Sequence, residues 1–587
     1  MTPHILRPME LSPDQKIAGI LTPLFALRSE NDLGIGDIGT LREFIDWSAE
    51  YGFRVVQLLP INETGNDNSP YNAISSVALD PATIEINCHT VPDLREADLR
   101  EVLSGVDLDS LRKGSVNYPV VKELKRNLLR RAFERFTADH WELDDGRARK
   151  FQKFIQIEAA WIESYALFRV LIDRNGVGEC WDMWPAEQQS AVATRAWLAS
   201  LHTPERMAFE DEMRFVMFIQ WIAFSQWREI KRYAESRGVV LMGDVPFGVS
   251  YYSADVFADP GIFDLQWSGG APPEPLFRDD PFTVKWGQNW GVPLYHWEVL
   301  KARRLDWWRQ RVSKVREIFH LFRIDHVLGF YRIYGFPWRP QRNGEFLEMT
   351  KDEAKAVTGG LLPHFHEFDD DTPEHCEANR ANGEARLTPL IEEVGQYRLI
   401  GEDLGTVPKY VRPSLASLGI AGFKVPQWET RWDTHLIPGS EYQRLSIATF
   451  ATHDHEPLRV QWERWMAIIE RAEHEDSKPV LEARDWTWWE VRRMSAWAGF
   501  EVPCITPFEE VHEKLLGGLF ACNSWIAVCM ITDVFGSTQR FNVPGAVSDS
   551  NWSQRLAGTV GSWREDRGIS EKMQRIHDLI VEAGRGK

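Results

Sequence analysis

The stretch Leu321–Ile333, LFRIDHVLGFYRI, begins as an apolar strand and then places Arg323, Asp325 and His326 within four residues. Polar groups at the end of a buried strand need partners, or they act on a molecule that binds there. The same pattern, an apolar and β-branched run that ends in polar residues, occurs eight times along the chain. The runs occupy residues 16–27, 53–61, 238–247, 319–326, 397–405, 421–428, 445–454 and 524–536.

The number and spacing of these runs predict the fold class. Helix-like segments precede the second, third and fourth runs, at residues 39–52, 213–238 and 305–319. Strands that alternate with helices form a parallel sheet, and eight strands are the number that closes a β/α barrel. We therefore expect an α/β protein, with residues 1–587 forming one catalytic (β/α)8 TIM barrel that carries large helical and loop insertions.

Two long intervals between runs indicate where the insertions lie. Residues 85–215, after the second strand, carry helical signals and predict a mainly helical insertion. Within it, apolar residues at three- and four-residue intervals predict one helix face: Phe154, Ile157, Trp161, Tyr165, Phe168 and Ile172. Residues 336–385, after the fourth strand, are rich in Gly, Asp, Glu and Pro, and predict a loop-rich insertion over one barrel face.

The overall composition argues against several classes of partner. The chain of 587 residues has a formal net charge of -19, so it has no basic excess with which to bind nucleic acid or an anionic membrane. Residues 1–19 lack the apolar run of a signal peptide, and no segment approaches about 18 consecutive apolar residues, which favours a cytoplasmic protein. The six cysteines form no CxxC pair, so we expect reduced thiols that pack in the core and no zinc site.

In a β/α barrel, the active site lies at the carboxyl ends of the strands, so the polar residues that end the runs can be considered together. They are Asp244, Arg323, Asp325, His326, Glu402, Asp403, His453, Asp454 and His455. Several carboxylates at one barrel mouth are what a retaining glycosidase needs, because one attacks the anomeric carbon and another protonates the departing oxygen.

Other interpretations apply to individual residues. A single Asp at a strand end is often a helix cap or an ion-pair partner, and Arg323 could simply neutralise Asp325. Asp403 follows Glu402 directly and points to the other side of its strand, which favours a structural role. His453 and His455 flank Asp454 and could bind a metal, so a metal-dependent barrel hydrolase remains an alternative.

Six ordered motifs resemble those of one family. They are RIDH at 323–326, GEDLG at 401–405, THD at 452–454, and the longer stretches 58–76, 243–257 and 535–552. These motifs resemble the 4-α-glucanotransferases of glycoside hydrolase family 77, the amylomaltases, over nearly the whole chain. The resemblance implies transfer of segments of α-1,4-glucans and maltooligosaccharides to glucose or maltooligosaccharide acceptors, with no cofactor and no metal.

The resemblance also implies catalytic roles. It makes Asp325 the nucleophile, Glu402 the general acid/base and Asp454 the stabiliser of the transition state. The residue pattern is compatible with these roles, because Arg323 lies on the same strand face as Asp325 and would favour its ionised form. Glu402 has no adjacent cation in the sequence, which suits a group that must be protonated when the leaving group departs.

The substrate contacts come from the same resemblance. It implies that the side chains around the catalytic carboxylates bind sugar, and it places Asp67, Ser69 and Tyr71 on the donor side and Gln288, Asn289 and Trp290 beside a lid, with Asp244, Arg323, His326 and His453 nearer the centre. The lid stretch at 269–291 is longer than is usual in the family and lacks its usual aromatic residue, while His455 and Glu456 replace a common Asn-Asp pair. A plain α-glucan hydrolase and a catalytically silent glucan-binding protein are further alternatives.

Overall fold

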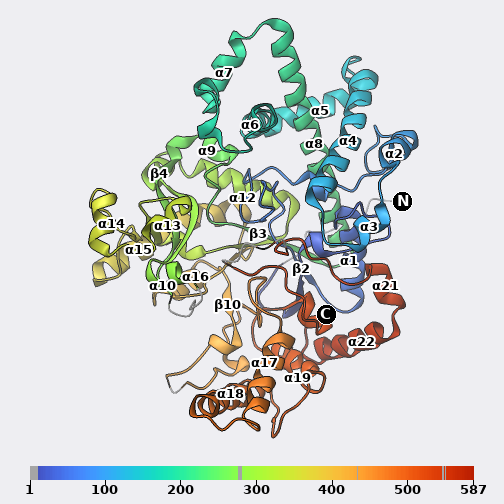
Figure 1. Cartoon of the computed structure of the whole chain (residues 1–587). Coiled ribbons are helices and arrows are strands. Elements are labelled where there is room, and N and C mark those ends of the chain that lie inside the picture. The colour runs from blue at the N-terminus through green and yellow to red at the C-terminus, as the bar shows by residue number, and fades with distance from the viewer. Residues whose placement is uncertain (1–10, 275–279, 433, 545–547, 549, 587) are drawn as a thin grey trace.

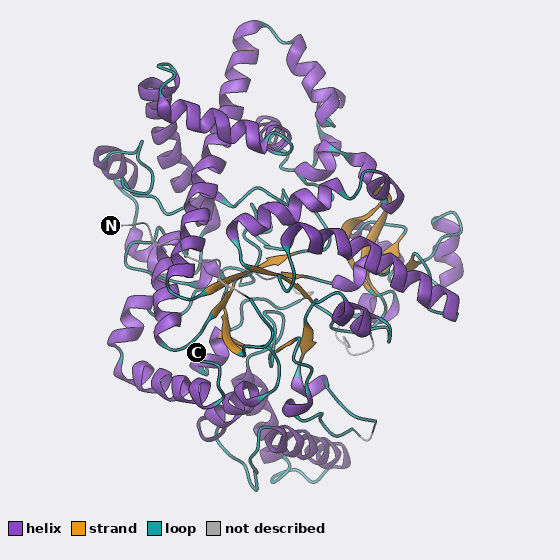
Figure 2. Cartoon of the chain, turned by 180° about the vertical axis from the view of Figure 1, so that it is seen from behind, coloured by secondary structure: helices purple, strands orange, loops and turns teal. Residues whose placement is uncertain are grey.

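Eight parallel strands form the centre of the computed structural model, which describes residues 11–274, 280–432, 434–544, 548 and 550–586. Figure 2 shows these strands enclosed by helices. Each strand lies within one of the eight runs predicted from the sequence. The strands are β1 (Ile17–Leu21), β2 (Val55–Gln57), β3 (Val240–Val245), β6 (Leu321–Ile324), β9 (Leu399–Gly401), β10 (Gly422–Lys424), β11 (Ser446–Ala448) and β12 (Ile526–Met530).

The strands follow one another around a closed barrel. Their order in the sheet is β10-β11-β12-β1-β2-β3-β6-β9, and every neighbouring pair is parallel. The two edges meet through a parallel bridge between Ile400 and Ala421, in which the Gly401 amide donates to the Ala421 carbonyl at 2.9 Å. Strands buried on both faces read as continuous apolar runs, which is why the sequence predicted the (β/α)8 TIM barrel correctly.

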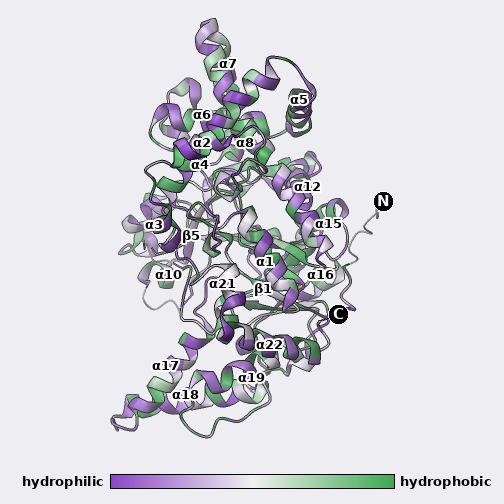
Figure 3. Cartoon of the chain, turned by 90° about the vertical axis from the view of Figure 1, so that its right-hand side faces the viewer, coloured by the Kyte–Doolittle hydropathy of each residue, from purple (hydrophilic) through white to green (hydrophobic). Residues whose placement is uncertain are grey.

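The helices that cover the barrel have one apolar side. In α22 (Arg567–Glu582), the buried residues Met573, Ile576 and Ile580 recur at intervals of three and four. Figure 3 shows residues of both kinds, hydrophobic and hydrophilic, along such helices. The other covering helices are α1 (Ile38–Glu50), α8 (Thr203–Ser236), α12 (Asp306–Ile318), α15 (Pro373–Val394), α16 (Val411–Ser417) and α19 (Phe508–Ala521).

The segment 85–215 contains a group of helices on one side of the barrel (Figure 1). The single helix face predicted across Phe154 to Ile172 is wrong, because the chain breaks between α5 and α6 and leaves Ile157 60% exposed. Glu158 is the last residue of α5, and its buried carboxylate lies 2.9 Å from Lys314 Nζ. The helices are α2 (Glu96–Leu103), α3 (Leu108–Lys113), α4 (Tyr118–Phe136), α5 (Gly146–Glu158), α6 (Ile162–Asn175), α7 (Ala191–Ser200) and the beginning of α8.

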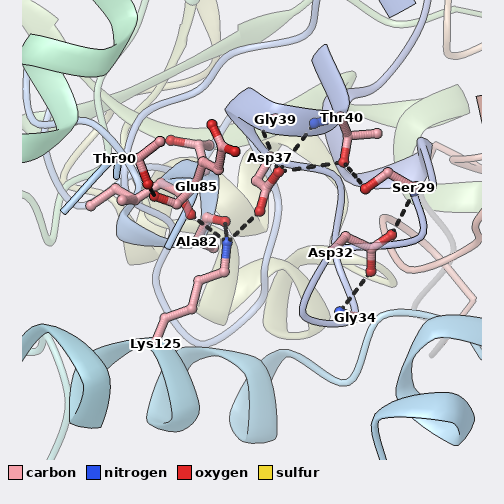
Figure 4. Close-up of polar contacts among 12 residues, drawn as sticks. Ser29, Asp32, Gly34, Asp37, Gly39, Thr40, Ala82, Glu85, Thr90 and Lys125 are labelled. Atoms are coloured by element: carbon pink, nitrogen blue, oxygen red, sulfur yellow. Dashed lines mark hydrogen bonds and ion pairs between the residues drawn. The ribbon is translucent and has the colours of Figure 1, made fainter. Parts of the chain in front are cut away.

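A buried lysine fastens this helical group to the barrel (Figure 4). Lys125 on α4 donates to the carbonyls of Ala82 and Ile84 at 2.7 Å each, and lies 3.3 Å from the carboxylate of Asp37. Asp37 also caps the first helix by accepting from the amides of Gly39 and Thr40. All three ammonium hydrogens therefore have acceptors, which is the condition for burying a charge.

A second, antiparallel sheet stands beside the barrel. It consists of β5 (Gln288–Tyr295), β4 (Phe263–Ala271), β7 (Ile333–Phe336) and β8 (His364–His366), in that order. Of the lid stretch 269–291, residues 275–279 lie outside the described part of the chain. Within 336–385, the stretch expected to be loop-rich, the structure has α13 (Asn343–Phe346), α14 (Lys351–Val357), β8 and the first half of α15.

A helical lobe formed by α17 (Leu458–Arg471), α18 (Lys478–Trp497) and α19 lies between β11 and β12. It is on the side of the barrel opposite α4 to α8 (Figure 1). The short helices are α9 (Ala254–Ala258), α10 (Pro281–Lys285), α11 (Trp297–Ala302), α20 (Ile531–Phe535) and α21 (Val560–Glu565). Across the described residues, no helix is both long and apolar enough to cross a membrane.

Candidate active site

Arg323, at the end of β6, joins two carboxylates on neighbouring segments. Its Nη1 donates to both carboxylate oxygens of Asp244, at 2.8 and 2.7 Å, and its Nη2 lies 2.6 Å from Oδ1 of Asp325. The Asp244 side chain is 1% exposed, whereas that of Asp325 is 31% exposed. Of these two carboxylates, Asp325 is therefore the one that an incoming molecule can reach.

Tyr71 completes the surroundings of Asp244. Its hydroxyl donates to Oδ2 of Asp244 at 2.6 Å, and its ring stacks on His453 with 4.9 Å between centroids. Burial raises the pKa of Tyr71 well above its usual range, and the charge of Asp244 raises it further, so the hydroxyl keeps its proton. Asp244 therefore accepts hydrogen bonds from both Arg323 and Tyr71, and it orients these two side chains at the barrel mouth.

Glu402, at the end of β9, has a different environment. Its carboxylate accepts from the backbone amides of His326 at 2.8 Å and Leu404 at 3.0 Å. Burial raises the pKa of Glu402 to about 7, and the nearby charge of Asp325 acts in the same direction, while Arg323 opposes both. Near neutral pH this side chain is therefore a mixture of acid and carboxylate, as a group that both gives and takes a proton should be.

His326 connects Asp325 to Glu402 through the backbone. Its φ of 47° lies in the left-handed region, which non-glycine residues seldom adopt. In this conformation the His326 amide donates a hydrogen bond to the Glu402 carboxylate. Residues held in such backbone conformations are concentrated at functional sites. Burial lowers the pKa of the His326 side chain to about 4, so the ring is neutral at pH 7.

Asp454, after β11, is positioned by the distant C-terminal segment. Its Oδ1 accepts from Asn542 Nδ2 at 2.6 Å, its backbone carbonyl accepts from Arg540 Nη2 at 2.6 Å, and its Oδ2 lies 3.3 Å from His453 Nε2. Burial acts to raise the pKa of Asp454, but the neighbouring His453 and the bond from Asn542 outweigh it, and the net shift is downward. The carboxylate is therefore ionised at neutral pH and 41% exposed.

The two histidines beside Asp454 point to different partners. His455 Nδ1 accepts from the Thr452 amide at 3.1 Å and lies 2.9 Å from its hydroxyl, whereas His453 lies against Tyr71. Within the described ranges, no three or more His, Cys, Asp or Glu residues are grouped as metal ligands would be. The metal-dependent alternative therefore lacks geometric support in this part of the chain.

The stretch Gln288–Trp290 begins β5, and its side chains contact different partners. The Asn289 amide nitrogen donates to the carbonyl of Trp338 at 3.0 Å and to Oδ1 of Asn343 at 3.1 Å, so Asn289 fastens the antiparallel sheet. Trp290 is 40% exposed, donates to Gln288 Oε1 at 3.1 Å, and meets the His326 ring edge to face at 4.8 Å. Trp290 thus contacts His326, the residue that follows Asp325 in the sequence.

Asp67, which was expected to contact substrate, and Asp403, which was expected to be structural, both bond to nearby protein groups. Asp67 forms a turn, accepting from the Ser69 amide at 3.1 Å and from Asn72 Nδ2 at 2.7 Å, and the structure records no contact of Asp67 or Ser69 with the described carboxylates. Asp403 accepts from the Phe423 amide at 2.6 Å and from Arg412 Nε at 2.9 Å, which is the structural role expected for it.

Sequence reasoning did not single out Arg540 and Asn542. Both lie in the stretch 535–552, which was recognised as a motif without any residue being assigned a task. Trp552, from the same stretch, has its ring centroid 5.9 Å from those of Tyr71 and His453. The residue types carried no signal for this role, because the contacts of Arg540 and Asn542 with Asp454 join segments that are distant in the sequence.

Comparison with known proteins identifies the relatives of this chain. The sequence profile of glycoside hydrolase family 77, described as 4-alpha-glucanotransferase, matches residues 22–560. A 4-alpha-glucanotransferase of Chlamydia pneumoniae is 30% identical over 575 residues, covering 96% of this chain and 95% of the relative. One from Thermus thermophilus is 29% identical, covering 89% of this chain and 91% of its own length.

Solved structures show the same fold. An amylomaltase from Streptococcus agalactiae, in complex with acarbose, has a TM-score of 0.71 at 21% identity, covering 98% of this chain and all of its own. An amylomaltase from Corynebacterium glutamicum has a TM-score of 0.72 at 21% identity, covering 97% of this chain and 75% of its own. The extent of the profile match and the relatives that align end to end lead to one conclusion: this chain belongs to glycoside hydrolase family 77, the 4-alpha-glucanotransferases.

Proposed function

We propose that the chain transfers segments of α-1,4-glucans and maltooligosaccharides to glucose or maltooligosaccharide acceptors, by a retaining double displacement at Asp325 and Glu402. The relatives named above are 4-alpha-glucanotransferases, and the proposal assigns that reaction to particular side chains of this chain. The observation that carries it is the contrast between two carboxyl groups at one barrel mouth. Asp325 is half-buried and held by a cation, while burial raises the pKa of Glu402 to about 7.

In the first step, a carboxylate oxygen of Asp325 attacks the anomeric carbon of the donor sugar. The bond from that carbon to the glycosidic oxygen breaks, and protonated Glu402 gives its proton to the departing oxygen. The products are a glycosyl ester of Asp325 and a shortened glucan that carries the new hydroxyl. Arg323 keeps Asp325 oriented for this attack through the 2.6 Å contact.

In the second step, Glu402 acts as a base. Its carboxylate takes the proton from a hydroxyl of the acceptor sugar, whose oxygen attacks the anomeric carbon and releases Asp325. The ionised carboxylate of Asp454 accepts hydrogen bonds from sugar hydroxyls, and those bonds tighten as the ring flattens in the transition state. Asn542 and Arg540 act on Asp454 and not on the sugar, so they are positioning residues.

The same ester can react with water, so the plain hydrolase is the nearest rival. Trp290 favours transfer in this proposal, because it is 40% exposed and stands beside His326, next to the nucleophile. An acceptor sugar stacked on such a ring is concentrated at the reacting centre in competition with water.

Incubation of the purified protein with maltotriose separates the alternatives. Transfer gives free glucose together with oligomers longer than maltotriose, whereas hydrolysis gives only maltose and glucose. A glucan-binding protein without activity gives neither set of products. Products separated by anion-exchange chromatography at several early time points provide the measurement, and the absence of longer oligomers contradicts the proposal.

A further inference from the structure

The tryptophans of this chain are unevenly distributed between the core and the surface. All 26 lie in the described residues, and five of them belong to none of the three hydrophobic clusters: Trp290, Trp428, Trp432, Trp486 and Trp489. Trp290 stands at the lid, as described above. The other four lie in the stretch that runs from the end of β10 to α18, and Trp428 is the one beside the active site.

Trp428 marks the edge of the active site. It ends the short 3-10 helix Pro426–Trp428 that follows β10, and it is 48% exposed. Its ring centroid is 5.0 Å from that of His455, the residue after Asp454. An exposed indole therefore stands one residue away from a catalytic carboxylate, on the side where the chain leads toward α18.

Arg493 joins this edge to the surface of α18. Its Nη2 donates to the Gln427 carbonyl and its Nη1 to the Thr434 carbonyl, each at 3.3 Å. The same guanidinium lies 4.2 Å above the ring of Trp489 and forms two bonds with Glu490, at 2.7 and 3.0 Å. The position of Trp489 is thereby fixed relative to the segment that carries Trp428.

Trp486 extends the surface away from the barrel. Its ring centroid is 4.8 Å from that of Trp489, and the two planes are inclined by 38°. Residues 486, 489 and 493 recur at intervals of three and four, so they share one face of α18. Trp486 is 63% exposed. The two indoles form an aromatic surface on α18, and Arg493 connects it to the segment that carries Trp428.

These rings are not needed to attach α18 to the lobe. The helix already packs through other residues. Val491 and Met494 belong to the main hydrophobic cluster, and Trp488 and Trp497 pack against it. Val480 is also buried. A large indole left mostly in water forgoes the stabilisation that burial would provide, about 25 cal/mol per Å² of apolar surface. Exposed apolar patches that are rimmed by polar residues mark interaction sites and ligand-binding grooves.

Resting on the proposed function, we propose that Trp486 and Trp489, reached through Trp428, form an outer binding surface for a long α-glucan chain whose other part occupies the active site. Flat apolar pyranose faces stack on exposed aromatic rings, as other flat apolar groups do. Arg493 and Glu490 stand beside the rings and can bond to sugar hydroxyls. The occupant is a neutral sugar polymer because Arg493 links the surface to the segment of Trp428 at the active-site edge, and the net charge of -19 disfavours polyanions.

The proposal predicts a dependence on chain length. A trisaccharide is bound at the catalytic carboxylates, whereas amylose extends past Trp428 onto α18. Trp486→Ala should therefore raise the KM for amylose about fivefold and leave maltotriose turnover within about twofold of the wild type, since one stacking contact contributes on the order of 1 kcal/mol. Trp486→Phe keeps a ring and should restore most of the amylose affinity.

Binding can be measured without turnover in an Asp325→Asn background, by retardation of the protein in native gels that contain amylose. Trp486→Ala should shorten the retardation and Glu482→Ala should not, because Glu482 lies one turn away on α18, is exposed and carries no ring. Circular dichroism verifies that both variants fold.

The outcomes distinguish this inference from the function on which it rests. Wild-type protein that makes no longer oligomers from maltotriose overturns the proposed function. Wild-type protein that makes them, while Trp486→Ala and the double variant with Trp489→Ala bind amylose as tightly as the parent, overturns the outer surface alone. An equal loss of amylose affinity in Trp486→Phe and Trp486→Ala also overturns it, because a stacking site retains affinity for a phenyl ring.

Discussion

The raised pKa of Glu402 makes the pH dependence of the reaction a direct test of the active site. The donor step needs Glu402 protonated, and burial raises its pKa to about 7. Protonation of an acid falls as pH rises through its pKa, so kcat/KM should be retained below pH 7 and lost above it. With this pKa, about one tenth of the molecules are protonated at pH 8 and about one hundredth at pH 9. The expected slope is a tenfold loss for each pH unit.

An ordinary glutamate would behave very differently. With the usual value for this side chain, roughly one molecule in several thousand would be protonated at pH 8, and the basic limb would lie below pH 5. The assay is the initial rate of glucose release from low concentrations of maltotriose between pH 4.5 and 9.5, because kcat/KM reports the free enzyme. Circular dichroism at each pH ensures that the loss of rate is not unfolding.

A matched variant ties the basic limb to this side chain. Glu402→Gln keeps the shape but cannot exchange a proton, so the rate should fall by at least about a thousandfold and no longer depend on pH near 7. A wild-type profile that is flat to pH 9.5, or a Gln variant that keeps the same basic limb, refutes the assignment of Glu402 as the acid/base.

The other predictions concern residues on either side of this group. Asp325→Asn should lower turnover by several orders of magnitude while folding and sugar binding persist, and a variant that keeps a tenth of the wild-type rate excludes Asp325 as the nucleophile. Asn542→Ala should lower kcat about ten- to a hundredfold with little change in Tm, because it removes one bond to an ionised carboxylate; an unchanged kcat contradicts the role given to it. Activity should survive prolonged dialysis against EDTA, and inactivation that added zinc reverses supports the metal alternative. Trp290→Ala should lower the ratio of transfer to hydrolysis several-fold in maltotriose digests, whereas a parallel fall of both rates indicates that Trp290 only packs the lid.

The barrel could be predicted from the sequence because each of its strands is buried on both faces. β1 and β12, for example, consist of five buried residues each, and such runs contain few polar interruptions. The antiparallel sheet could not be predicted in the same way. Its strand β5, QNWGVPLY, contains Gly291 and Pro293, which are depleted in strand interiors and read as loop signals. Tertiary pairing with β4 overrides this local preference.

The helical insertion shows a similar limit. The spacing of apolar residues from Phe154 to Ile172 fits one helix, yet the chain bends after Glu158. The bend brings the Glu158 carboxylate to Lys314 on α12 and to Arg228 on α8, and both partners are distant in the sequence. A periodicity argument considers only neighbours along one segment, so it does not register these ion pairs between distant segments.

Within the active site, the sequence identified the strand-end carboxylates but not what holds them. Asp454 depends on Asn542, 88 residues further along the chain, and only the folded structure brings the two together. Asp325 directly follows β6, two residues after Arg323, so their contact followed from the two-residue period of side chains. Contacts within one strand are thus accessible to sequence reasoning, whereas contacts between segments are not.

The different roles proposed for the carboxylates follow from which of them the Arg323 guanidinium contacts. Its Nη1 donates to Asp244 and its Nη2 lies 2.6 Å from Asp325. Glu402 is left with two backbone amides in a buried position beside another negative charge, and its proton is retained to about pH 7. Asp325 lies directly against the cation, and its side chain is 31% exposed. The nucleophile and the acid therefore differ because Arg323 contacts Asp325 directly, whereas its charge offsets only part of the effect of burial on Glu402.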